Sequence, residues 1–151
     1  MTPETSGSIS VSTNYLTPSD PSLPALALQV TQLVGSYMLW VGTTEGSPED
    51  VDKATMQGNL CKDWACAMPP KVVPTIPATS LFRSSESDIA LSMAQRLAKR
   101  FTKQIFLSID VPSSFMTIGQ GPKLLLDVEK GIVATLLEME QSHADSRSTD
   151  I

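Results

Sequence analysis

The sequence has few histidines and cysteines, and it has no basic residues near its amino terminus. The scarcity of histidine argues against catalysis. His143 is the only histidine. It lies in the polar residues 142–151, which we expect to form a flexible tail. A Ser-His-Asp or Cys-His site would therefore need its base on a disordered segment. We predict no catalytic residues and expect that the protein is not an enzyme.

The two cysteines, Cys61 and Cys66, do not indicate a disulfide or a metal site either. Their odd spacing would place them on opposite faces of a strand, which disfavours a disulfide between them. The spacing also differs from that of a zinc knuckle, and no second ligand pair accompanies it. We expect two buried free thiols in a reducing compartment, and no metal.

A nucleotide-binding loop is missing as well. The segment Gly119-Gln120-Gly121 lacks the third glycine of a dinucleotide-binding loop and the Gly-Lys-Ser/Thr of a phosphate loop. It is interpreted as an ordinary turn. We therefore expect no cofactor.

Charge and hydropathy exclude two further classes of partner. The chain has 11 Lys+Arg against 16 Asp+Glu, and this net charge of -5 opposes binding to nucleic acid or anionic lipid. The longest strongly apolar run, residues 37–41, is far shorter than the roughly 20 residues that cross a bilayer. Residues 1–24 contain no Lys or Arg and no apolar core of a signal peptide. We expect no nucleic-acid partner, no membrane partner, and a location in the cytoplasm and nucleus.

What is present is the pattern of one α+β domain over residues 25–141. Alternating apolar residues predict strands over residues 25–34, 60–68 and 104–111, and further strands are expected at the apolar run 37–41 and at residues 78–82. Apolar residues at every third or fourth position predict one helix that ends at about Thr102 and a second over residues 124–140. The Ser/Thr/Pro-rich residues 1–24 are expected to be a disordered arm, and residues 42–59 and 113–122 are expected to be loops.

This order of elements predicts an antiparallel or mixed sheet of about six strands with two helices packed on one face. In a domain that works alone the other face should be polar. The strand at residues 37–41 is apolar on both sides, however, and Phe106 adds to the side that the helices leave open. We therefore expect Met38, Trp40 and Phe106 to lie on a face used for dimerisation. The alternative is that the loop 42–59 folds over this face.

The one concentrated basic feature lies at the end of the first helix. It consists of Arg96, Lys99, Arg100 and Lys103. Such a group can be the solvated end of a helix, or it can contact an acidic surface of another protein. Both interpretations stay open from the sequence.

Four segments, taken in order, resemble the proteasome assembly chaperone 4 family. They are Ser36–Gly42 (SYMLWVG), Ile76–Leu81 (IPATSL), Leu91–Arg100 (LSMAQRLAKR) and Thr102–Ser108 (TKQIFLS). The helix expected over residues 124–140 is compatible with the same family. None of these segments is a catalytic motif, and the resemblance depends on their order.

The resemblance implies a non-enzymatic chaperone of 20S proteasome assembly. It implies a heterodimer with proteasome assembly chaperone 3, in which the sheet of one chaperone stacks on that of the other. The heterodimer would help proteasome α-type subunits, including an α5-type subunit, to form the α-ring. The basic group would then be a candidate client surface. The alternative function is a small α/β scaffold or trafficking adaptor that binds other proteins.

Overall fold

Six strands form a single sheet with the spatial order β1-β2-β3-β6-β4-β5. The strands are β1 (Ser10–Leu16), β2 (Ala25–Leu33), β3 (Ser36–Thr44), β4 (Asp63–Ala67), β5 (Ala78–Arg83) and β6 (Gln104–Asp110). All neighbours are antiparallel except β3 and β6, which run parallel. The computed structural model describes residues 8–71, 75–83 and 88–149. The predicted α+β fold is confirmed, with a mixed sheet and not a wholly antiparallel one.

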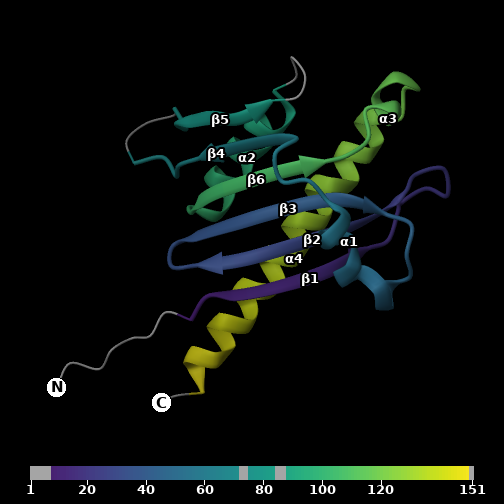
Figure 1. Cartoon of the computed structure of the whole chain (residues 1–151). Helices are drawn as coiled ribbons and strands as arrows, with labels where there is room; N and C mark the ends of the chain where they lie inside the picture. Colours follow the sequence, from purple (N-terminus) through teal and green to yellow (C-terminus); the bar gives the residue numbers. More distant parts are fainter. Residues whose placement is uncertain (1–7, 72–74, 84–87, 150–151) are drawn as a thin grey trace.

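Two helices, α2 (Ile89–Phe101) and α4 (Gly121–Ser148), cover one face of this sheet (Figure 1). Each helix buries a stripe of apolar residues at helical spacing, as the sequence predicts. The buried residues are Ala90, Met93, Ala94, Leu97, Ala98 and Phe101 on α2, and Leu124, Val128, Ile132 and Leu136 on α4. They pack against strand residues such as Leu28, Leu39 and Leu107, which are fully buried. This side of the sheet is called the inner face below.

The prediction of a disordered arm over residues 1–24 is wrong for the part that the structure describes. β1 pairs with β2 along its whole length, from Ser10 opposite Gln32 to Leu16 opposite Leu26. Leu16 also packs on α4, where a Cβ at Gly131 would lie 2.5 Å from the leucine side chain. An edge strand exposes much of its surface and needs few apolar residues, so its composition resembled that of a disordered segment. Residues 1–7 lie outside the described residues.

The predicted flexible tail is helical up to Ser148, because α4 continues through residues 142–148. The hydroxyl of Ser142 donates a hydrogen bond to the Glu138 carbonyl at 3.0 Å, and Ser146 donates to the Ser142 carbonyl at 2.8 Å. These polar side chains are thus satisfied by the helix itself. His143, on the same turns, has its Nε2 atom 3.1 Å from Oε1 of Gln32 in β2.

Both segments predicted as loops contain short helices. Residues 42–59 contain η1 (Pro48–Asp50) and α1 (Val51–Gln57), and α3 (Ser114–Thr117) precedes α4. In Figure 1, α1 lies on the side of the sheet away from α4. Among the described residues, none of the helices has the length and apolarity that a membrane crossing requires.

Candidate functional site

The outer face, which is the sheet face opposite to α2 and α4, carries a continuous row of uncharged side chains. Register places one residue of each strand in this row, and we call these six residues the open row. They are Val11, Thr31, Met38, Phe106, Cys66 and Thr79. Because neighbouring strands lie about 4.8 Å apart, the open row is about 24 Å long.

The rest of the chain leaves the open row only partly covered. Met38, Phe106 and Cys66 are half-buried, and Val11 is 59% exposed at one end. Phe82, which pairs with Trp64 on the same face, is 46% exposed. The inner face already has its two helices, so an uncharged row on the other side is typical of a surface that another molecule covers.

Trp40, which the sequence places on the same partner face, is covered by the chain itself. Its side chain is 7% exposed and packs with Ala27 and with Val51 and Ala54 of α1. The alternative in which residues 42–59 fold over the outer face is therefore correct at Trp40. It does not extend to Met38 and Phe106, which stay in the open row.

Hydrogen bonds hold the segment that follows α1 against β6. The hydroxyl of Ser108 donates to the Leu60 carbonyl at 2.7 Å, and the Asn59 amide donates to Oδ2 of Asp110 at 2.6 Å. Lys62 lies 3.8 Å from the other carboxylate oxygen of Asp110. These contacts leave Ser108 fully buried and make α1 a fixed part of the outer face.

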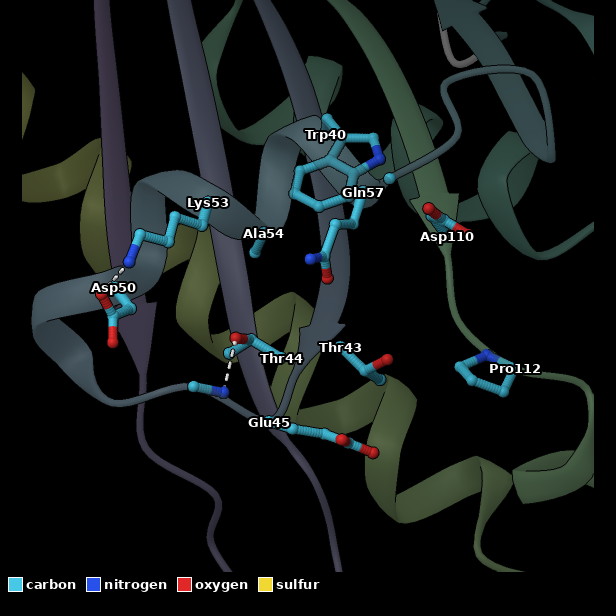
Figure 2. A pocket seen from close by; sticks show the side chains of 12 residues that line it. Trp40, Thr43, Thr44, Glu45, Asp50, Lys53, Ala54, Gln57, Asp110 and Pro112 are labelled. Atoms are coloured by element: carbon cyan, nitrogen blue, oxygen red, sulfur yellow. Dashed lines mark hydrogen bonds and ion pairs between the residues drawn. The ribbon is translucent and has the colours of Figure 1, made fainter.

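A cavity of about 500 Å³ lies between α1 and the end of β3, and Figure 2 shows the side chains that line it. Lys53 donates to Asp50 at 2.8 Å, and this hydrogen bond lowers the pKa of Asp50. Asp110, which also lines the cavity, accepts from the Asn59 amide and lies near Lys62. His143 is not among its lining residues. Within the described part of the chain, no three His, Cys, Asp or Glu side chains are placed to hold a metal ion. The residues that line this cavity include neither histidine nor cysteine, so it holds no Ser-His or Cys-His pair.

Both cysteines are free, and their environments differ from the sequence prediction. Cys61 is exposed because it precedes β4, so it is not the buried thiol that we expected. Cys66 lies in the open row, where the Gln104 side chain donates to its sulfur at 3.4 Å.

Two of the four predicted basic residues are paired on the inner side of the molecule. Arg96 donates to both carboxylate oxygens of Glu129 at 2.8 and 2.9 Å, and this interaction raises the pKa of Arg96. Burial would lower the pKa of Lys103, but hydrogen bonds to Tyr37 and Glu140, both 3.1 Å, outweigh burial and raise it. These pairs connect α2 and its C-terminal end to α4.

The other two basic residues, Lys99 and Arg100, are exposed and have no ion-pair partner among the described residues. They line a groove of about 500 Å³ between α2 and α4, whose floor includes Leu97 and Val133. The basic residues and the open row therefore lie on opposite sides of the sheet. The structure brings Met38 and Phe106 together, as register neighbours, and separates them from the basic group.

Comparison with known proteins assigns the chain to a family. The family model described as "Proteasome assembly chaperone 4" matches residues 25–111, more than half of the chain. This chain belongs to the proteasome assembly chaperone 4 family. The matched residues contain β2 to β6, α1 and α2, and thus five of the six residues of the open row. β1 and α4 lie outside the match.

A solved structure shows the same fold as this proteasome assembly chaperone 4 family member. It is described as a novel chaperone complex for yeast 20S proteasome assembly, and one of its chains matches with a TM-score of 0.52 and 16% identity. The match covers 87% of this chain and 96% of that chain. No curated protein matched the sequence. The resemblance seen in the sequence is confirmed.

The covering helix α1 is the site element that sequence reasoning missed. Only Val51 and Ala54 face the sheet, so its apolar pattern is too short to predict a helix. The sequence did contain a signal for a helix, because proline is common at the start of a helix and glycine directly after its end. Pro48 lies at the start of η1 and Gly58 directly after α1.

The packing of α1 on Trp40 predicts that Gly58→Ala destabilises the protein. An added Cβ would overlap the indole ring, which cannot bend aside as an aliphatic chain does. We expect a loss of about 1–3 kcal/mol in the free energy of unfolding, measured by urea denaturation. Gly46→Ala is the matched control, because its Cβ would lie 3.4 Å from the nearest atom. Equal stability of the two variants would contradict the packing of α1 described above.

Proposed function

We propose that this proteasome assembly chaperone forms a heterodimer with proteasome assembly chaperone 3 and promotes 20S α-ring formation without catalysing a reaction. The observation that carries the proposal is the open row, an uncharged and only partly covered surface on a member of a chaperone family. Binding and release are the mechanism, and no nucleotide is required. The heterodimer acts in the cytoplasm and nucleus.

A second sheet is the partner geometry that suits the open row best. Two sheets stack face to face about 10 Å apart, with side chains from both inner surfaces interdigitating. Met38 and Phe106 would lie at the centre of such a stack, because β3 and β6 are the two middle strands. The structure of similar fold comes from a chaperone complex for yeast 20S proteasome assembly, which supports a paired arrangement.

The client contact is assigned to the opposite side of the molecule. Lys99 and Arg100 stand free beside the groove between α2 and α4, and Arg96 and Lys103 flank them in fixed ion pairs. A positive surface of this kind favours an acidic patch on an α-type subunit, for which an α5-type subunit is the leading candidate. Because partner and client use opposite sides, both can bind at once.

The proposed stack predicts that charge in the open row prevents pairing. Phe106→Glu and Met38→Glu would each bury an unpaired carboxylate at the centre of the interface. We expect each variant to lose at least about a hundredfold in affinity for proteasome assembly chaperone 3, measured by titration calorimetry after circular dichroism confirms folding. Leu126→Glu is the control, because this exposed α4 residue is as apolar but far from the open row.

Wild-type affinity in both open-row variants would refute the assignment of this face. Copurification from cells separates the proposal from the alternative of a scaffold or trafficking adaptor. The proposed chaperone function requires that immature α-type subunits copurify with the protein. An adaptor would recover its cargo and no proteasome precursors.

The client assignment predicts a different loss for the double variant Lys99→Glu and Arg100→Glu. Four units of charge change at the groove should reduce the recovery of α-type subunits several-fold, with the effect growing at low salt. Binding to proteasome assembly chaperone 3 should stay unchanged. The double variant Lys123→Glu and Lys130→Glu carries the same charge change on exposed parts of α4. If this control reduces the recovery of α-type subunits as much, the net charge of the protein and not the groove determines client binding.

A further inference from the structure

The outer face carries an obstacle to any sheet that stacks on it. α1 lies on this face, held on Trp40 by Val51 and Ala54. An α-helix with its side chains is about 10 Å across, and stacked sheets lie about 10 Å apart. α1 therefore fills the layer that a partner sheet would occupy. A stacked sheet can extend over the open row only until it meets the side of α1.

A second cavity of about 220 Å³ lies where α1 meets the open row. Its walls include Thr31 and Met38 of the open row, together with Trp40 of β3 and Thr55 of α1. None of the residues that line it is charged. A cavity of about 150 Å³ is enough for one benzene ring, whereas small-molecule sites usually start at about 300 Å³. The volume therefore suits one large side chain better than a metabolite.

We propose that this cavity receives one large apolar side chain from the sheet of the partner chaperone, and that α1 thereby sets the register of the stack. The inference rests on the proposed function, because it names a contact of the same interface. The cavity shares Thr31 and Met38 with the open row, so a sheet lying on the row brings side chains directly over its mouth.

Met56 is a second observation that points to the same partner. It follows Thr55 on α1 and is 86% exposed, so it contributes little to the packing of its own chain. Met56 does not line the cavity, but its flexible thioether on the exposed side of α1 can adapt to the edge of an incoming sheet. α1 then acts as a side wall that contacts the partner, in addition to covering Trp40.

Filling the cavity from within tests the proposal. Thr55→Phe places a ring where the partner side chain would enter, whereas Gln57→Phe places the same ring on the side of α1 that faces the larger cavity. We expect Thr55→Phe to weaken binding of proteasome assembly chaperone 3 at least about tenfold in titration calorimetry, and Gln57→Phe to change it less than about twofold. Thr55→Lys and Gln57→Lys repeat the comparison with a charge in place of a ring.

A photo-reactive benzoylphenylalanine at position 56 provides a readout that does not depend on these variants folding, because Met56 is almost fully exposed. It should cross-link to a strand of proteasome assembly chaperone 3. If the wild-type chain binds this partner but the Thr55 variants bind as tightly and position 56 does not cross-link, the inference is overturned and the proposed function stands. If the wild-type chain does not bind it, the proposed function fails and the inference fails with it.

Discussion

Two helices can cover one face of a six-stranded sheet, and the rest of this structure follows from that limit. α2 and α4 bury Leu28, Leu39 and Leu107 completely on the inner face. The central strands β3 and β6 also carry large apolar side chains on their other side, where no long helix of the described residues reaches. Leaving apolar area in water costs about 25 cal/mol per Å², so the outer face favours any element, of this chain or another, that covers it.

The outer face is divided between the chain's own cover and a surface left open. α1 and the bonded segment at Asn59 and Leu60 close the part around Trp40. The open row beside it, with Met38 and Phe106 at its centre, is only partly covered. In the proposed stack, the same short helix that protects Trp40 also limits how far the partner sheet can extend, so one element would serve both stability and specificity. The basic groove on the inner side is independent of this division, which allows a second protein to bind there.

The sequence predicts those parts whose local pattern is strong. α2 and β6 have clear periodicity and β3 is a strongly apolar run. β3 and β6 lie within three residues of their predicted bounds, and α2 ends one residue before the predicted Thr102. β1 and the last turns of α4 have low hydrophobicity, and their order comes from contacts such as Leu16 with Gly131, which no local pattern reveals. The covering of Trp40 and the pairing of Arg96 with Glu129, 33 positions apart, are tertiary facts of the same kind. Sequence reasoning therefore found the faces of the sheet but not which residues remain free on them.

Methionine footprinting tests the central claim, that another protein covers the open side of the sheet. Met68, which follows β4 on the outer face, is 40% exposed, and Met116 of α3, away from that face, is 36% exposed. The chain would be treated with hydrogen peroxide alone and in complex with proteasome assembly chaperone 3, and sulfoxide at each methionine quantified by mass spectrometry. The account predicts that complex formation slows oxidation of Met68 several-fold and leaves Met116 unchanged. Equal oxidation of Met68 in the free chain and in the complex would contradict it.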